Sequence, residues 1–347
     1  MRLLAFAPCA LTFAAVYEDN ATPFTMTDAI AFERVTKIYE SRQVALADVS
    51  FRLPTGSTVG LLGANGSGKS TIIRLALGLI TPSAGRIEAL GGRMHPGAKA
   101  LRQRIGYLSD DPTFPKDITA ISYLRFVGRC FGLERCERKA RMGTLLRAVG
   151  LMDDAGRKIG TYSTGMKTRL GVAASLMNDP ELLVWDEPTA GLDPISRRQT
   201  LELLATFRGR KTIVLSSHIL GDIDRVCDRL LVLNQGQLLF DGLRSDLENL
   251  LPESVLELRV AGSVSRFRDA IRERLGREDL CRESDRVRLE LNGDHAIGEI
   301  VEPLLAVAKD TATVITGINS TSRRLEDAYL KLITEDEFRG FLRASKS

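Results

Sequence analysis

The sequence predicts an α/β fold built around a mainly parallel sheet, and three of its segments carry that prediction. Val59–Leu79 reads as a short apolar strand, a glycine-rich turn and then a helix. Leu182–Trp185 is an unbroken apolar run, typical of a strand buried on both faces of a parallel sheet, and Thr212–Leu215 is a second apolar strand. With 347 residues, the chain is long enough for one large domain and a smaller one.

Composition and charge describe an ordinary folded protein and not a disordered or membrane-spanning one. Hydrophobic residues make up 44% of the chain and charged residues 27%. The net charge of +4 is slight for this length, and we expect no nucleic acid among the partners. The five cysteines are scattered without a Cys-x-x-Cys pair, which suits free thiols in a reducing compartment.

Residues 1–25 are expected to form an extension outside the folded core. Leu3–Val16 is apolar but shorter than the ~20 residues that a membrane-spanning helix needs. It resembles a weak export signal, although Phe13 is too large for the usual cleavage site. Met26 then opens a segment typical of the beginning of a folded domain, while a genuine export signal is the alternative interpretation.

The glycine-rich turn has the spacing of a phosphate-binding loop. Gly63, Gly68, Lys69 and Ser70 fit the pattern G-x-x-x-x-G-K-[ST], in which successive backbone N–H groups face one ligand. Lys69 supplies charge for the outer phosphates, and the Ser70 hydroxyl can bind Mg²⁺. The nucleotide-binding candidates in this segment are Gly63, Ala64, Asn65, Gly66, Ser67, Gly68, Lys69, Ser70 and Thr71.

Two acidic residues end the apolar run Leu182–Trp185. Asp186 lies at the carboxyl end of this strand, where ligands bind in open α/β sheets, and it suits a water-mediated contact to Mg²⁺. Glu187 beside it is a candidate general base for an attacking water. Acidic residues often end strands, but the combination with a phosphate-binding loop makes the interpretation strong.

A further anion site is predicted in the stretch YSTGMKTRLG, residues 162–171. Ser163 and Gly165 stand at the start of a basic, apolar helix. A helix N-terminus presents unpaired N–H groups and partial positive charge, which favour an anion. An ordinary serine-capped helix is the simpler alternative.

Together, the phosphate-binding loop, this Ser-x-Gly helix start, the AGLD that follows Glu187 and His218 in IVLSSHIL resemble the ATP-binding-cassette (ABC) ATPases. The resemblance covers about Ile30–Gly242 and implies a P-loop NTPase cassette over residues 26–245. It further implies an antiparallel β subdomain and a helical subdomain at about 112–161 that grips a membrane subunit. ATP and Mg²⁺ are the implied ligands, and ATP hydrolysis is the implied activity.

The resemblance also assigns roles to single residues around the bound ATP. Tyr39 would stack on the adenine, with Val44 packing nearby. His218 would contact the γ-phosphate and the attacking water, and would join Glu187 and Lys69 as the catalytic residues.

Other roles concern a second copy of the cassette. Ser163 and Gly165 would face an ATP molecule held by that copy, and Asp193 would cross the dimer interface. Thr164 and Met166 replace a glycine and a glutamine of the usual signature, a form that occurs in the export-type, ABC-2-like branch with separate membrane subunits.

One position near the metal departs from the family pattern. Asp110 stands where the family usually has glutamine, or glutamate in some branches. Its shorter carboxylate could still contact Mg²⁺ or water, so Asp110 joins Ser70 and Asp186 as a candidate metal ligand.

A small α+β domain is predicted over residues 255–340. Alternating patterns predict strands at 255–260, 286–291 and 312–318, separated by helices at 265–276 and 297–309. The closing helix at 323–336 resembles the C-terminal region of export-type cassettes. The domain shows no catalytic constellation.

The preferred function is therefore the ATP-hydrolysing subunit of a membrane exporter, bound peripherally to the cytoplasmic face of the membrane. Two copies would close on two ATP molecules and drive separate transmembrane permease subunits. The alternative is a soluble ABC ATPase that acts on DNA or ribosomes, but the interval between Lys69 and Tyr162 lacks the heptads of a long coiled coil. A binding module without catalysis conflicts with the presence of both Glu187 and His218.

Overall fold

The computed structural model describes residues 28–40, 42–251, 254–275, 286–291, 297–322 and 325–344. The chain divides between Leu243 and Arg244 into two compact units, and each unit is described by itself. The extension predicted at residues 1–25 lies outside the described residues. None of the helices in the described ranges combines the length and the apolarity needed to cross a bilayer.

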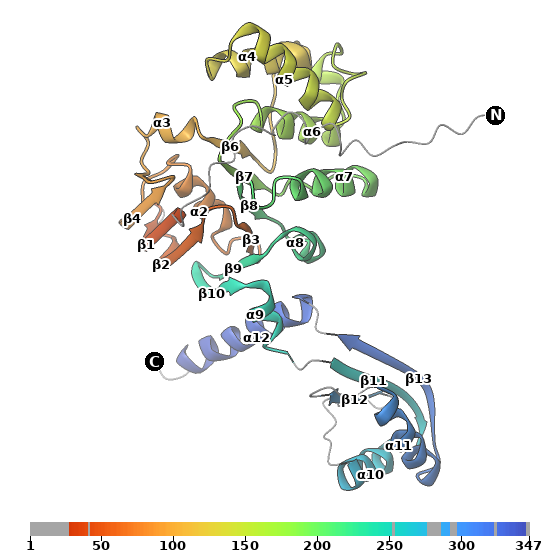
Figure 1. The fold of residues 1–347 in the computed structure, drawn as a ribbon. Helices are drawn as coiled ribbons and strands as arrows, with labels where there is room; N and C mark the ends of the chain where they lie inside the picture. The colour runs from red at the N-terminus through yellow and green to blue at the C-terminus, as the bar shows by residue number, and fades with distance from the viewer. Residues whose placement is uncertain are drawn as a thin grey trace, which may run out of the picture. The chain divides into compact units, whose positions relative to one another are not determined.

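The N-terminal unit contains a six-stranded sheet with the order β10-β9-β3-β8-β7-β6 (Figure 1). Strands β9 to β6 run parallel, and only β10 is antiparallel to its neighbour. The predicted apolar strands are confirmed as β3, β7 and β8, whose residues are all buried. The strands are β3 (Thr58–Leu62), β6 (Ile105–Leu108), β7 (Leu182–Asp186), β8 (Thr212–Ser216), β9 (Arg229–Asn234) and β10 (Gln237–Leu243).

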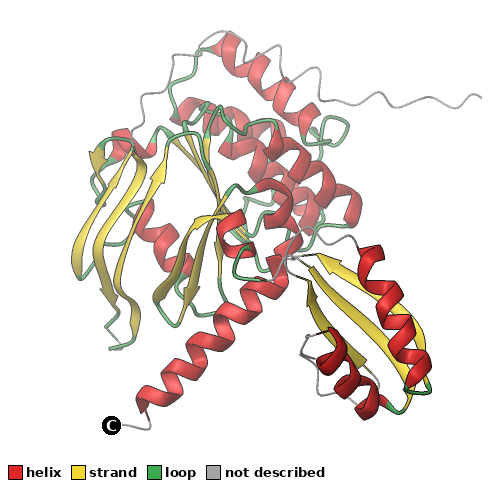
Figure 2. Cartoon of the chain, turned by 60° about the horizontal axis from the view of Figure 1, so that its bottom comes forward, coloured by secondary structure: helices red, strands yellow, loops and turns green. Residues whose placement is uncertain are grey.

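A four-stranded antiparallel sheet with the order β2-β1-β4-β5 packs near this sheet, and helix α2 (Lys69–Ala76) contributes to the core between them (Figure 2). Phe32 and Phe51 stack with ring centroids 4.5 Å apart on the inner side of the antiparallel sheet. Ile72 and Ile73 of α2 belong to the same apolar cluster. The strands are β1 (Asp28–Ile38), β2 (Val44–Pro54), β4 (Ala84–Ala89) and β5 (Gly92–Arg93).

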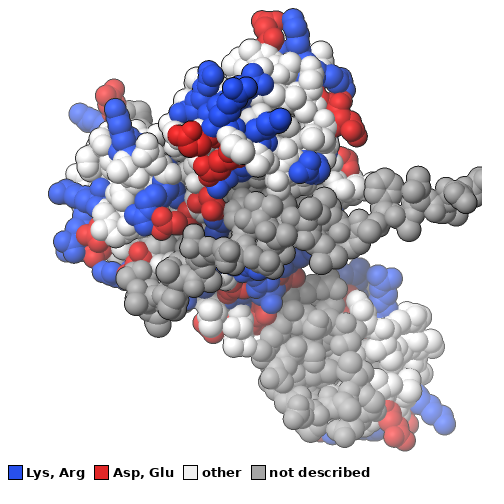
Figure 3. All heavy atoms as spheres, turned by 45° about the horizontal axis from the view of Figure 1, so that its top comes forward, with Lys and Arg blue, Asp and Glu red and all other residues white. Residues whose placement is uncertain are grey.

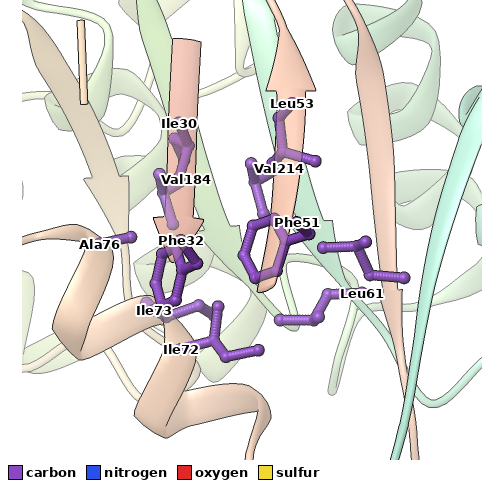
Figure 4. A pocket seen from close by; sticks show the side chains of 11 residues that line it. Ile30, Phe32, Phe51, Leu53, Leu61, Ile72, Ile73, Ala76, Val184 and Val214 are labelled. Carbon is purple, nitrogen blue, oxygen red and sulfur yellow. The ribbon is translucent and has the colours of Figure 1, made fainter. Parts of the chain in front are cut away.

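A small cavity lies within this core (Figure 4). Only apolar side chains line it, so it offers no partner for a buried water or a polar ligand. The cavity therefore belongs to the packing of the core and not to a binding site. Its lining residues include Phe32, Phe51, Leu61, Ile72, Ile73 and Val214.

Three helices of the N-terminal unit begin at side-chain caps. Thr119 accepts a hydrogen bond from the N–H of Ser122 at the start of α4, and Ser163 caps α6 in the same way. Asp193 caps α7, where Pro194 occupies the first helical position. The helices are α3 (Lys99–Arg102), α4 (Ala120–Cys130), α5 (Arg135–Ala148), α6 (Thr164–Ser175), α7 (Pro194–Ala205) and α8 (Leu220–Val226), with a 3₁₀ turn at Ile159–Thr161.

Helices α4 and α5 lie within the segment predicted to be helical at about 112–161, and they carry exposed basic side chains. Lys and Arg side chains gather over this part of the unit (Figure 3). The exposed basic residues of the two helices are Arg125, Arg129, Arg135, Lys139 and Arg147.

The C-terminal unit is a three-stranded antiparallel sheet, order β12-β11-β13, covered by two helices. Leu258, Phe267 and Leu304 are among the fully buried residues that join the sheet to α10 and α11. This confirms the predicted α+β character of the segment. The elements are α9 (Arg244–Glu248), β11 (Ser254–Gly262), α10 (Val264–Leu275), β12 (Arg286–Leu291), α11 (Ile297–Asp310), β13 (Thr313–Ser322) and α12 (Leu325–Ala344).

Phe32→Ala should lower the free energy of unfolding of the N-terminal unit by about 3–5 kcal/mol, because it removes a ring that is 1% exposed at the centre of the core. Phe126→Ala should change it by less than about 0.5 kcal/mol, because that ring is 62% exposed. Urea denaturation followed by the fluorescence of Trp185, the single tryptophan of the chain, reports on this unit. Equal destabilisation by the two substitutions would contradict the packing described above.

Candidate active site

The phosphate-binding loop joins the carboxyl end of β3, an inner strand of the six-stranded sheet, to α2. Gly68, the residue before α2, has a φ of 112°, a left-handed conformation that glycine adopts readily. A Cβ at Gly68 would lie 2.9 Å from the carbonyl oxygen of Ala45, so the loop passes too close to β2 for a side chain. Ser67 is 3% exposed, and among the described residues its hydroxyl has no hydrogen-bond partner. A buried, unpaired hydroxyl fits a loop that closes on an oxyanion, because pairing removes the cost of its burial.

Lys69, the first residue of α2, is 8% exposed and folds back over the loop. Its Nζ donates hydrogen bonds to the carbonyl oxygens of Gly63 at 2.7 Å and Ala64 at 3.2 Å. Burial lowers the pKa of Lys69, whereas the charges of Glu187 and Asp186 raise it. The ammonium is therefore close to both acids and to the loop, where it can pair with phosphate charge.

Ser216, the last residue of β8, contacts the two acids at the end of β7. Asp186 and Ser216 are paired in the parallel ladder, and the Ser216 hydroxyl donates to Oδ1 of Asp186. The same hydroxyl oxygen accepts a hydrogen bond from the N–H of Glu187 at 3.0 Å. Burial raises the pKa of Asp186, the bond from Ser216 lowers it, and the charges of Asp110 and Glu187 raise it. A carboxylate in this position favours a cation beside it.

Glu187 and His218, the candidate base and its predicted partner, are in polar contact. Oε2 of Glu187 lies 2.7 Å from Nδ1 of His218. Because an ionised carboxylate only accepts hydrogen bonds, Nδ1 carries the hydrogen, and Nε2 of His218 is left for another group. The Glu187 side chain is 16% exposed and the imidazole 60% exposed, so the pair opens to solvent on the histidine side.

The backbone at Glu187 is held in an unusual conformation. Its φ is 49°, in the left-handed region, which costs a non-glycine residue about 1–3 kcal/mol. Its N–H lies 3.2 Å from the carbonyl oxygen of Ser216, in addition to the hydroxyl contact. Strain that the surrounding hydrogen bonds maintain is typical of functional sites.

The three candidate metal ligands lie in the first turn of α2, after β6 and at the end of β7. Ser70 is exposed in the first turn of α2. Asp110 follows β6, which pairs with β7 in the register Leu108↔Trp185, and its charge raises the pKa of Asp186. No group of three acidic, histidine or cysteine side chains within the described ranges could hold a metal by itself. Hydroxyl and carboxylate oxygens nevertheless suit Mg²⁺, which commonly binds one or two carboxylates together with substrate phosphates.

Tyr39 and Val44 lie beside the phosphate-binding loop. The Tyr39 hydroxyl is 3.4 Å from Oγ1 of Thr71, in helix α2. Val44, at the start of β2, is 51% exposed, and Nζ of Lys37 lies 5.3 Å from the centroid of the Tyr39 ring. The Tyr39 side chain thus lies next to the helix that follows the loop, and the contact with an adenine stays a prediction for both residues.

The signature helix α6 begins against the loop that follows Glu187. The hydroxyl of Ser163 accepts a hydrogen bond from the N–H of Met166 at 3.2 Å, and the first turn contains no acidic residue. A Cβ at Gly165 would lie 3.3 Å from Cδ2 of Leu192, so even an alanine would be tight. The exposed Ser163 and the small Gly165 leave the positive end of the helix accessible to an anion.

Asp193 is used within its own chain in this structure. Its carboxylate accepts hydrogen bonds from the N–H groups of Ile195 and Ser196, both at 3.0 Å, and from the Ser196 hydroxyl at 2.6 Å. The hydrogen bonds from Ser196 lower the pKa of Asp193. Its predicted contact across a dimer interface stays a prediction.

Comparison with known proteins identifies the family. Residues 46–190 match the family model described as ABC transporter. The chain is 31% identical over 311 residues to the uncharacterized ABC transporter ATP-binding protein YxlF of Bacillus subtilis (strain 168), covering 88% of this chain and 99% of that protein. The chain belongs to the ABC transporter ATP-binding proteins.

Two further matches agree with this assignment. The chain is 33% identical over 305 residues to the Nod factor export ATP-binding protein I of Rhizobium leguminosarum bv. viciae, covering 88% of this chain and 94% of that one. A solved ATP-binding subunit of an ABC transporter is 30% identical, with a TM-score of 0.60 over 65% of this chain and 93% of its own. The predicted family, its cassette fold and its ATPase activity are therefore confirmed for this ABC protein.

Sequence reasoning missed Ser216. The residue is fully buried, contacts both acids of the site and lies two positions before His218. Its place at the end of an apolar strand, beside the strand that ends in Asp186, was the available signal.

Lys69→Ala should abolish ATP binding by this ABC ATPase, because the loop loses the ammonium that Gly63 and Ala64 hold in place. Lys99→Ala, which removes an exposed lysine from α3, serves as the control and should bind ATP like the unaltered protein. Isothermal titration calorimetry measures both affinities. An affinity of Lys69→Ala within twofold of the unaltered chain would overturn the assignment of the loop.

Proposed function

We propose that this ABC ATPase is the energy-supplying subunit of a membrane exporter and acts as a homodimer with separate transmembrane permease subunits. The similarity to a Nod factor export ATP-binding protein, which extends over 94% of that protein, carries the proposal. The subunit would lie peripherally on the cytoplasmic face of the membrane, where ATP is supplied. Residues 26–245 would be the ATPase domain, with the helical subdomain at about 112–161, and 255–340 the C-terminal domain.

The proposed hydrolysis uses the Glu187–His218 pair. Glu187 orients the attacking water and accepts its proton, while His218 donates from Nδ1 to Oε2 of Glu187 and keeps that carboxylate in place. The second carboxylate oxygen is then left to contact the water. Nε2 of His218 is free to contact the γ-phosphate or the water, and Lys69 pairs with the outer phosphates.

Ser70, Asp186 and Asp110 would hold Mg²⁺, because they supply hydroxyl and carboxylate oxygens and the charge of Asp110 acts on the buried Asp186. When bound, Mg²⁺ supplies positive charge against the phosphate oxygens. Ser216 holds Asp186 by a hydrogen bond to Oδ1, which leaves Oδ2 for the metal or for its water.

The signature helix would complete the site of the second copy. Ser163 and Gly165 would present the start of α6 to the γ-phosphate of an ATP held by the partner, as the positive end of a helix favours an anion. Each ATP would then be enclosed only when two copies meet, so that nucleotide binding drives closure. The similarity to transporter subunits supports this reading over one in which the chain acts on DNA or ribosomes.

Glu187→Gln should lower ATP hydrolysis by about 10²–10⁴-fold, because the amide keeps the size of the side chain but cannot accept the proton. ATP binding should persist, and the variant should accumulate as an ATP-dependent dimer. Adding Ser163→Arg should prevent that dimer, because bulk and positive charge would then occupy the anion site. Size-exclusion chromatography with light scattering, with and without ATP, measures the dimerisation of both variants.

The control for the second substitution is Ser122→Arg in the Glu187→Gln background, which adds the same side chain at an exposed position of α4. It should leave the dimer intact. Hydrolysis by Glu187→Gln at the unaltered rate would remove Glu187 from the mechanism, and dimerisation after Ser163→Arg would refute the role of the signature helix.

The exporter assignment itself predicts a membrane partner. Affinity purification of the full chain from detergent-solubilised membranes of its source should recover a multi-span protein in stoichiometric amount, identified by mass spectrometry. Recovery with ribosomes or DNA, and not with a membrane protein, would favour the alternative function.

A further inference from the structure

Asp222 is a buried carboxylate that the mechanism above does not use. It lies in α8 and is 2% exposed. Oδ2 accepts a hydrogen bond from the Thr189 hydroxyl at 2.6 Å, and Oδ1 lies 2.7 Å from both Nε and Nη2 of Arg197. Both oxygens of the carboxylate are therefore engaged by side chains from other segments.

Its partners connect the two segments that carry the proposed catalytic pair. Thr189 is 2% exposed and lies two residues after Glu187, in the loop that joins β7 to α7. Arg197 lies in the first turn of α7, at the other end of that loop. Helix α8, which carries Asp222, begins two residues after His218. The Asp222 carboxylate thus links the segment after Glu187 to the segment after His218 through hydrogen bonds.

The energetics argue for a positional role. A buried carboxylate pays a large desolvation penalty, and replacing a buried ionic group by apolar residues of similar volume is often neutral or stabilising. A well-packed apolar contact between α7 and α8 would therefore hold these helices together equally well. Directed hydrogen bonds fix a geometry that apolar packing leaves adjustable, because they depend on angle as well as distance.

The loop between Glu187 and Asp193 needs such a constraint. Glu187 has a left-handed φ of 49°, and Gly191 has a φ of 70°, so two of its residues lie outside the ordinary backbone regions. The Thr189 hydroxyl is the side-chain anchor between these two positions, and it bonds to Asp222.

We propose that Asp222 is a positioning residue for ATP hydrolysis. Through Thr189 and Arg197 it fixes the loop after β7, and thereby keeps Oε2 of Glu187 within hydrogen-bond distance of Nδ1 of His218. This inference rests on the proposed function in one respect, namely that Glu187 activates the water. Asp222 is 2% exposed and both of its carboxylate oxygens are engaged by Thr189 and Arg197, so it acts through these residues.

The test compares three variants of the full chain: Asp222→Asn, Thr189→Val and the two combined. Each should lower kcat about 10-fold or more, because a small displacement of a catalytic group has effects of this size. The dissociation constant for ATP should stay within twofold, since the phosphate-binding loop is untouched. The combined variant should be no slower than the slower single one, because both substitutions act on the same Thr189–Asp222–Arg197 network, in which an asparagine can accept from only one of the two partners.

Arg225→Gln is the matched control. It breaks another contact between α8 and α7, an exposed one in which Nη2 of Arg225 lies 3.5 Å from Oε1 of Glu202. Exposed pairs of this kind contribute little, so kcat should not change. Loss of kcat in this control would show that any disturbance of the helix pair suffices, and would overturn a specific role for Asp222.

A second measurement separates positioning from stability. The triple variant Thr189→Val, Asp222→Leu and Arg197→Met replaces the polar group by apolar side chains and should keep the thermal midpoint of the unaltered chain while kcat stays low. Hydrogen–deuterium exchange should be faster in residues 187–193 of Asp222→Asn and unchanged in β3. If the triple variant does not fold, Asp222→Asn alone decides.

Three outcomes would overturn the inference: kcat of Asp222→Asn within twofold of the unaltered chain, an equal loss of ATP affinity, or additive effects in the combined variant. Glu187→Gln, measured in parallel, distinguishes the two proposals. If it is inactive while Asp222→Asn is active, only the positioning role fails. If Glu187→Gln hydrolyses ATP at the unaltered rate, the proposed mechanism fails whatever Asp222 does.

Discussion

The parallel pairing of β3, β8 and β7 is the constraint on which the site depends. The register sets Leu61 opposite Ser216 and Ser216 opposite Asp186, so the three strands end at nearly the same level. Because parallel strands all present their carboxyl ends to one edge, the phosphate-binding loop, the two acids and His218 emerge together. A shift of one residue in this register would turn the polar ends toward the opposite faces of the sheet and separate them.

The charged side chains at the carboxyl ends of these strands shift one another's pKa values, and their charges favour a charged ligand. Lys69 is the ammonium close to Asp186 and Glu187, and burial lowers its pKa while these acids raise it. Burial likewise raises the pKa of Asp186, and Asp110 raises it further. A group that carries both a divalent cation and phosphate charge would satisfy the carboxylates and the ammonium together, and a nucleotide with Mg²⁺ is such a group.

Much of the fold could be predicted from the sequence because local sequence patterns determine its elements. The strands β3, β7 and β8 are continuous apolar runs, and the glycine spacing between β3 and α2 defines the loop. The strands and helices of the C-terminal unit follow from alternation and helical periodicity, which confirms its α+β class. The strand order β12-β11-β13 could not be predicted, because local patterns do not say which strands pair.

The contacts that organise the site lie beyond local patterns. The Ser216–Asp186 and Thr189–Asp222 hydrogen bonds join residues 30 and 33 positions apart, and each depends on the strand order. Nothing in the composition near Ser216 or Asp222 distinguishes them from ordinary strand-end and helix residues. They become recognisable only once β7 and β8 are adjacent, which sequence periodicity cannot establish.

The loop between Glu187 and Asp193 contacts both the Glu187–His218 pair and the start of the signature helix. At its beginning, Glu187 is anchored on Ser216 and contacts His218. Near its end, Leu192 lies against Gly165 at the start of the signature helix, since a Cβ there would be 3.3 Å away. Thr189 anchors the segment between these two ends through its hydrogen bond to Asp222. If the signature helix were displaced in the proposed dimer, this anchor would oppose a displacement of the Glu187 carboxylate.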